Sequence, residues 1–228
     1  MRERARRDGV ELASDAASAV AGADLVISAV TASATRDAAA AAAPAMRAGA
    51  FLLDLNSASP TTKAACGTLV NATGGRYVES AVMTSVPPYG IRVPMLVGGP
   101  DAAALAPTLA ALGFSASVAS AELGVASAIK MCRSVMIKGM EAIVIESYLA
   151  ARRYGVEAEV LASLAETFPG IDWERQGSWF WTRVVQHGKR RAEEMRESAA
   201  TMREAGFEGI MASAIAERHQ WVADQIEK

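Results

Sequence analysis

The stretch GVASAIKMCRSVMIKGMEAIVIESYLAARRY, residues 124–154, decides the fold because it predicts one long helix with no internal proline. At 1.5 Å per residue such a helix spans roughly 45 Å, long enough to lead from one domain into the next. The helical period places Ser134, Lys138, Glu141 and Ile145 on the same side as Lys130. The other sides are apolar, so we expect a largely buried helix with one polar stripe. Its apolar residues include Ile129, Met136, Ile137, Met140, Ile143 and Val144.

The polar stripe has two possible explanations. Lys138 and Glu141 are three residues apart and could neutralise each other as an internal ion pair. Alternatively, the stripe lines a cleft in which Lys130 meets a ligand. The spacing alone favours the ion pair, because unpaired lysines are almost never fully buried.

Composition excludes several classes of protein. The chain has 228 residues, of which 51% are hydrophobic, enough for one large or two small domains. Its net charge of −2 argues against nucleic acid as a partner, and we expect the basic runs 2–7 and 189–191 to be solvated helix faces. Cys66 and Cys132 lack metal-site spacing, so we expect no metal and a cytoplasmic location.

Neither the start of the chain nor its longest uncharged stretch predicts a membrane partner. The basic start is followed by acidic residues rather than by an apolar region, so it is not a secretory signal. Residues 102–121 are interrupted by Pro107 and Gly113, which favours a helix, a turn and a strand over a membrane span.

The order of the elements predicts an α/β protein. Continuous apolar strands alternate with helices up to about residue 120, which is typical of a sheet covered on both faces. The expected strands are 24–30, 51–55, 77–82, 93–97 and 115–118, with a short one possible at 10–12. We expect Ser14 to cap a helix that ends at Ala21, and Ser59 with Pro60 to start a helix that runs to about Asn71. After the long helix the sequence predicts only helices, at 157–168, 172–205 and 211–225.

Small polar clusters follow three of these strands. In a doubly wound sheet ligands bind at the carboxyl ends of the strands, so the clusters outline a site together with Lys130. Ordinary turn and cap chemistry would favour the same residue types. The clusters are Thr31–Ser33 after Val30, Asn56–Ser57 after Leu55, and Met83–Ser85 after Val82.

Three motifs occur in the order of a known family: Asp54-Leu-Asn-Ser-Ala-Ser-Pro60, then Gly90-Ile-Arg-Val-Pro-Met-Leu-Val-Gly-Gly99, then Gly124 followed by Lys130-Met131. From about residue 20 to 155 the chain resembles the 6-phosphogluconate dehydrogenase and 3-hydroxyisobutyrate dehydrogenase group of β-hydroxyacid dehydrogenases. The resemblance implies an incomplete Rossmann-like doubly wound sheet, residues 1–120, which binds NAD(P). It implies an all-α domain similar to the 6-phosphogluconate dehydrogenase C-terminal domain, residues 121–228, for substrate and dimerisation.

The resemblance also implies an activity, namely hydride transfer between NADP or NAD and the CH–OH group of a small hydroxy acid. Lys130 would be the general acid/base, with its pKa lowered from about 10.4 toward neutrality in a partly desolvated cleft. By the same resemblance Val30, Thr31 and Asn56 would contact the cofactor, and Thr84, Ser85 and Ser134 the substrate. We expect a homodimer, with the aromatic segment Trp179–Trp181 in the core or at the subunit interface.

The chain departs from the family at three places. The usual S-G-G substrate loop is Met83-Thr84-Ser85, and the asparagine four residues after the lysine is Ser134. No G-x-G-x-x-G occurs, so the glycine-rich βαβ unit that holds the pyrophosphate is missing from these residues. We interpret this as truncation rather than as a reduced protein. Two other functions stay open, a non-catalytic dimerisation or regulatory remnant and a reductase of imines or other non-acid carbonyls.

Overall fold

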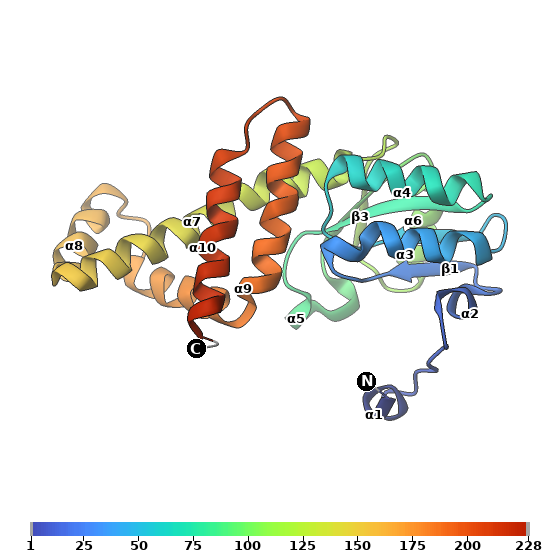
Figure 1. Ribbon diagram of the computed structural model, residues 1–228, viewed down its shortest axis with the longest axis horizontal. Coiled ribbons are helices and arrows are strands. Elements are labelled where there is room, and N and C mark those ends of the chain that lie inside the picture. Colours follow the sequence, from blue (N-terminus) through green and yellow to red (C-terminus); the bar gives the residue numbers. More distant parts are fainter. Residues whose placement is uncertain (1, 227–228) are drawn as a thin grey trace. The chain divides into compact units, whose positions relative to one another are not determined.

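The computed structural model describes residues 2–226, which divide into two compact units (Figure 1). The first unit ends at Lys130 and the second begins at Met131. Helix α7 (Val125–Tyr154) begins in the first unit and continues in the second. The long helix predicted over residues 124–154 is therefore confirmed, and no break interrupts it near Ser134.

The first unit is built on a mostly parallel sheet. Within residues 2–226 its order is β1 (Leu25–Ser28), β2 (Phe51–Asp54), β3 (Arg76–Val82), β4 (Met95–Gly98) and β5 (Ala116–Ser120). Only the β3–β4 pair is antiparallel in this sheet, as far as the chain is described. The strands follow chain order, as in one half of a doubly wound sheet. The mixed α/β fold class with a helical second half is confirmed.

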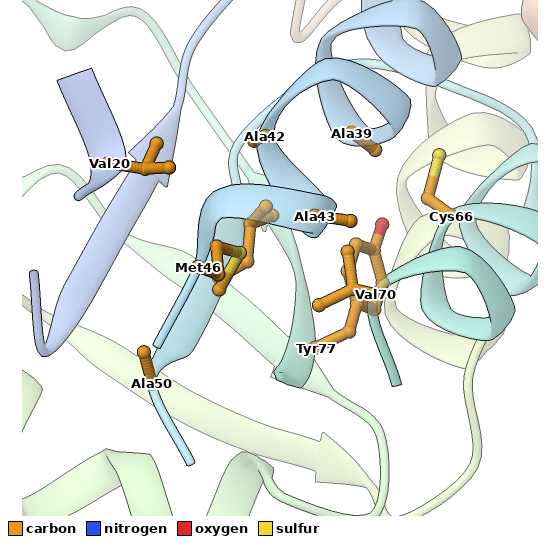
Figure 2. Packing of buried hydrophobic residues seen from close by; sticks show 10 residues of the cluster. Val20, Ala39, Ala42, Ala43, Met46, Ala50, Cys66, Val70 and Tyr77 are labelled. Atoms are coloured by element: carbon orange, nitrogen blue, oxygen red, sulfur yellow. The ribbon is translucent and has the colours of Figure 1, made fainter. Parts of the chain in front are cut away.

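Helices cover both faces of this sheet. Successive residues of a strand point to opposite faces, so Leu52 and Tyr77 belong to one core cluster, and Leu53 and Val78 belong to another. Figure 2 shows the first cluster, in which Tyr77 and Val70 pack against the alanine-rich turn around Ala43. The helices of the first unit are α1 (Arg2–Arg7), α2 (Ala16–Val20), α3 (Thr35–Ala42), α4 (Pro60–Ala72), α5 (Val86–Tyr89) and α6 (Ala102–Ala111), with 3₁₀ turns at Ala32–Ala34, Ala43–Ala45 and Gly90–Arg92.

Local signals set the helix starts. Ser59 caps α4, since its hydroxyl accepts a hydrogen bond from the Thr62 N–H, and Pro60 is the first helical residue, as predicted. The cap of α2 is Asp15, whose carboxylate accepts from the Ser18 N–H at 2.8 Å. The predicted cap Ser14 is therefore wrong, because the helix begins one residue later than expected.

Two strand predictions need correction. Residues 10–12 form no strand, because their short apolar run has no neighbouring strand to pair with, and Val10 and Leu12 are exposed. The strand expected to be buried over 24–30 is shorter and lies at the edge of the sheet as β1. Its Ile27 is 44% exposed, since an edge strand has a neighbour on one side only.

The second unit contains only helices within the part of the chain that is described. The later helices are α8 (Glu157–Thr167), α9 (Trp173–Glu204) and α10 (Ile210–Ile226), and Figure 1 shows α9 and α10 side by side. Ala142 of α7, Met195 of α9 and Ile215 of α10 share one core cluster. Among residues 2–226 no helix has both the length and the apolar character that a membrane crossing requires.

Helix α7 buries polar and apolar side chains together, since Met131, Val144 and Ile145 are buried as well as the polar stripe. The predicted polar stripe is buried, with Ser134, Lys138 and Glu141 at most 8% exposed. Other apolar side chains are exposed, with Met136 at 68% and Ile143 at 59%. The expectation of a helix that is buried most of the way round is therefore wrong, because charged partners on α9 draw the polar stripe inward.

The predicted ion pair between Lys138 and Glu141 is also wrong. Lys138 Nζ lies 2.6 Å from Glu194 Oε2, and Glu141 forms its close ion pair with Arg191. Arg191 is buried, so the expectation of a solvated helix face at 189–191 fails at that residue. The pairing joins α7 to α9 across the second unit.

Candidate functional site

The carboxyl ends of β1 and β2 are joined by Asn56. The Asn56 side-chain oxygen accepts a hydrogen bond from the Val30 N–H at 2.6 Å, and its side-chain nitrogen donates to the Ser28 hydroxyl at 2.9 Å. The side chain is only 3% exposed. Of the predicted cofactor residues, the structure thus brings Val30 and Asn56 together, and Asn56 fixes the course of the chain after β1.

A buried network beneath Asn56 holds this turn in place. Asp54 accepts a hydrogen bond from the Asn56 N–H at 2.8 Å, and its carboxylate forms an ion pair with Lys63 at 3.0 Å. The Tyr77 hydroxyl donates to the other carboxylate oxygen at 2.6 Å. Burial and the nearby Asp54 carboxylate raise the pKa of Tyr77 well above its ordinary value, so its hydroxyl stays protonated and remains a donor.

Lys130 lies against the turn that follows β2. Its ammonium group donates a hydrogen bond to the Ser57 hydroxyl at 2.6 Å, in a partly buried position. Ser57 belongs to the polar pair that was noted after Leu55, but only Asn56 of that pair was assigned a role from the sequence. The contact places a lysine and a hydroxyl together at the carboxyl edge of the sheet, where an ammonium can donate a proton and a hydroxyl can pass one on.

The remaining predicted residues lie on loops or in the second unit. Thr31 is exposed after β1, where its hydroxyl lies 3.2 Å from that of Ser33. Thr84 and Ser85 are exposed on the loop after β3, at the same carboxyl edge of the sheet. Ser134 is buried on α7 in the second unit. The structure thus joins Val30 with Asn56 and Lys130 with Ser57.

The resemblance implies NAD(P) as the cofactor. The surface at the carboxyl end of β1 can be compared with the nicotinamide ring of that cofactor. Val30 is 44% exposed, and the neighbouring Thr31 is exposed as well, so an apolar side chain and a hydroxyl face outward where β1 ends. The Asn56 side chain fixes the Val30 backbone by accepting a hydrogen bond from its N–H. An apolar surface with a hydroxyl beside it suits a flat ring that carries an amide.

Comparisons with known proteins identify relatives of the whole chain. A family model described as a domain of unknown function (DUF1932) matches residues 151–222. A conserved hypothetical protein from Sinorhizobium meliloti 1021 is 41% identical; the match covers 100% of this chain and 76% of that one, with a TM-score of 0.79. The conserved protein MTH1747, of unknown function and reported to resemble 3-hydroxyacid dehydrogenases, is 32% identical over 98% of this chain and 83% of its own, with a TM-score of 0.74.

More distant structures share the fold. The 3-hydroxyisobutyrate dehydrogenase of Mycobacterium tuberculosis is 19% identical, with coverage of 97% and 82% and a TM-score of 0.75. Imine reductases and reductive aminases match at lower scores, for example 0.56 for the Myxococcus stipitatus imine reductase in complex with NADP⁺. A comparison with curated proteins finds no match. The identity to the first two proteins shows that this chain belongs to the family of 3-hydroxyacid dehydrogenase-like proteins.

Proposed function

We propose that this protein is an NAD(P)-dependent oxidoreductase of the β-hydroxyacid dehydrogenase type, acting on a small hydroxy acid. The observation that carries the proposal is the 2.6 Å contact between Lys130 and Ser57 at the carboxyl edge of the sheet. Lys130 is the general acid/base: its neutral amine takes the hydroxyl proton in oxidation, and its ammonium group returns the proton in reduction. Ser57 receives the lysine's hydrogen bond and holds the ammonium group at this edge.

The first unit binds the cofactor in this proposal. Val30 and Thr31 contact the nicotinamide end, and Asn56 keeps them in place through the Val30 N–H. When bound, the nicotinamide supplies or accepts the hydride. Thr84 and Ser85 of the loop after β3 contact the substrate in this proposal.

The lysine proposal is tested by steady-state kinetics with NADPH and NADH over a panel of hydroxy acids and the matching ketones and aldehydes. Lys130→Ala should lower kcat by roughly two to four orders of magnitude, the usual range for a general acid/base. Lys130→Arg should not restore it, because a guanidinium stays protonated and cannot accept a proton. The matched control is Lys189→Ala, which removes an exposed lysine of α9.

Two results would contradict the proposal in different ways. Near-normal turnover by Lys130→Ala would remove the lysine from the mechanism. Absence of any nicotinamide-dependent turnover over the whole panel would favour a non-catalytic dimerisation or regulatory role.

Cofactor affinity is a separate test. The 228 residues contain no G-x-G-x-x-G, whose loop and following helix N-terminus bind the pyrophosphate. Loss of a few charge-assisted hydrogen bonds, at about 1.5 to 3 kcal/mol each, moves a micromolar Kd to millimolar or weaker. Calorimetric titration should therefore show weak binding by these residues and tighter binding once a glycine-rich βαβ unit is added. Tight binding by the 228 residues alone would contradict this.

A second candidate function is reduction of imines or other non-acid carbonyls. Thr84 and Ser85 stand in place of the two glycines of the S-G-G loop, and the chain that follows them carries Val86, Tyr89 and Ile91, each about half exposed. Apolar side chains at this edge favour a substrate with an apolar substituent over a bare carboxylate. Turnover of cyclic imines or ketones, with no activity towards hydroxy acids, would favour this candidate.

The exposed apolar side of α7 supports a homodimer. Met136, Met140 and Ile143 of α7 and Trp179 and Trp181 of α9 are all exposed large side chains. Such residues are enriched in subunit interfaces, and an obligate dimer of this kind buries more than about 2,000 Å² in total. A monomer by light scattering at micromolar concentration would contradict the proposal.

A further inference from the structure

Glu79 is a fully buried acidic residue in the middle of β3, with 0% exposure. Its carboxylate accepts four hydrogen bonds from the start of α7. Oε1 lies 2.8 Å from the Gly124 nitrogen and 3.1 Å from the Ala126 nitrogen. Oε2 lies 3.3 Å from the Ser127 nitrogen and 2.7 Å from the Ser127 hydroxyl.

These contacts replace an ordinary helix cap. The first N–H groups of a helix have no partner within it, and a side-chain oxygen at the preceding residue usually accepts from them. Gly124, which precedes α7, has no side chain, so the acceptor comes from the sheet instead. A negative group at a helix N-terminus is further stabilised by the helix dipole.

The neighbouring strand leaves room for this carboxylate. Glu79 and Gly98 are paired directly across β3 and β4, and a Cβ on Gly98 would lie 2.6 Å from Glu79 Oε1. Burial of a carboxylate is unfavourable unless its oxygens are hydrogen-bonded, and an apolar residue would suit the interior of β3 equally well. The Gly98–Glu79 pair therefore serves the attachment of α7 to the sheet rather than the packing of the sheet itself.

The hydrogen bonds to Glu79 fix the rotation of the first turns of α7 and so the direction in which Lys130 extends. Lys130 lies four residues after Ala126 and three after Ser127, so all three share one side of the helix within about one turn. The lysine then reaches Ser57 at 2.6 Å, and Ser57 follows β2 in the same unit. β2 and β3 are adjacent in the sheet, so one rigid frame carries Ser57 and, through Glu79, the backbone from which Lys130 extends.

We infer that Glu79 is a positioning residue, which sets Lys130 against Ser57 by capping α7 from inside the sheet. The inference rests on the proposed role of Lys130 for its catalytic consequence, while its structural part can be measured without any substrate. Gly98 is part of the same device because it provides the space for the carboxylate.

The test compares two perturbing variants with a control in the full chain. Glu79→Gln keeps the shape of the side chain but puts an NH₂ group where an oxygen accepted from Ser127. Gly98→Ala leaves the carboxylate intact and displaces it by steric contact. The control, Arg76→Ala, removes an ion pair with Asp101 at the first residue of β3 and so weakens the same unit through a contact that does not involve α7.

Three measurements are made on each protein. Hydrogen exchange of residues 124–127 should accelerate roughly ten- to a hundredfold in both variants, the loss expected for charge-assisted hydrogen bonds. The rate at which an acylating reagent labels Lys130, followed against pH by peptide mass spectrometry, should change by about threefold or more, because the amine loses its hydrogen bond to Ser57 and its fixed surroundings. With an active substrate, kcat should fall roughly tenfold or more with little change in KM, because misplacement of a catalytic group affects the chemical step.

The outcomes separate this inference from the proposed function. If both variants exchange faster yet match Arg76→Ala in Lys130 labelling and in kcat, Glu79 is merely structural and the inference fails. If exchange at residues 124–127 is unchanged in both, the cap itself is refuted. If Lys130→Ala keeps full turnover, the proposed mechanism fails, while labelling and exchange still decide whether Glu79 positions the lysine.

Discussion

His219 makes the stability of the second unit depend on pH in a direction that the structure fixes. The side chain is fully buried on α10, and burial, with the nearby cations of Arg191 and Lys138, lowers its pKa from 6.5 to about 3. Glu194 acts in the opposite direction but more weakly, and Glu141 Oε2 lies 4.0 Å from the His219 ring. The folded protein therefore keeps this imidazole neutral in mildly acidic solution.

The sign of the pH dependence follows from proton linkage. Between about pH 6.5 and pH 3 the unfolded chain binds a proton at His219 that the folded chain does not bind, so the free energy of unfolding falls as the pH is lowered. The slope approaches about 1.4 kcal/mol per pH unit, which gives a loss of roughly 2 to 3 kcal/mol between pH 6.5 and pH 4.5. At pH 7 and above this contribution is absent.

Urea unfolding followed by tryptophan fluorescence measures this dependence. All four tryptophans, Trp173, Trp179, Trp181 and Trp221, lie in the second unit, so their emission reports on that unit. His219→Phe, a variant of similar shape that cannot be protonated, should have a flatter dependence at equal protein concentration. Other ionisable groups contribute to both proteins and cancel in the difference. Equal slopes for the two proteins between pH 6.5 and pH 4.5 would refute the reasoning.

Three further changes have expected outcomes. Lys63→Met should destabilise the first unit by about 3 to 5 kcal/mol in calorimetry, because Asp54 is left buried without its cation, and adding Asp54→Asn should recover part of the loss. Gly177→Ala should lower the urea midpoint of the second unit, at a cost of about 1 to 3 kcal/mol, because its Cβ would lie 2.3 Å from Tyr148 Cε2; an unchanged midpoint would show that α9 yields there at no cost. Met136→Glu should convert a dimer into a folded monomer in light scattering, whereas an unaffected dimer would place the interface elsewhere.

Much of the fold could be predicted because its signals are local. The long helix followed from a run without proline, and the start of α4 followed from Ser59 and Pro60, whose cap chemistry needs no distant partner. The strands of the first unit followed from their continuous apolar runs. The antiparallel direction of β4 was not specified, because the apolar pattern of a short strand does not distinguish parallel from antiparallel pairing.

The contacts of the charged residues could not be predicted from spacing. Lys138 pairs with Glu194, 56 residues away, although Glu141 lies only three residues from it. Sequence separation along one helix shows which pairs are possible but not which partners the packing of another helix provides. Glu79 was the clearest missed signal. A carboxylate within the buried run Tyr77–Val82 needs hydrogen-bond donors from inside the protein, and here the backbone at the start of α7 provides them.

The inward polar stripe of α7 explains why the same helix leaves apolar side chains exposed. A helix that is apolar nearly all round could pack on α9 in several rotations about its own axis with similar loss of exposed apolar surface. With Lys138 facing Glu194 and Glu141 facing Arg191, other rotations would leave buried charges without partners, at a cost of several kcal/mol. The charges thus select one rotation, and that rotation turns Met136 and Ile143 outward. Their exposure is a consequence of the ion pairs, and a second copy that covers them would remove it.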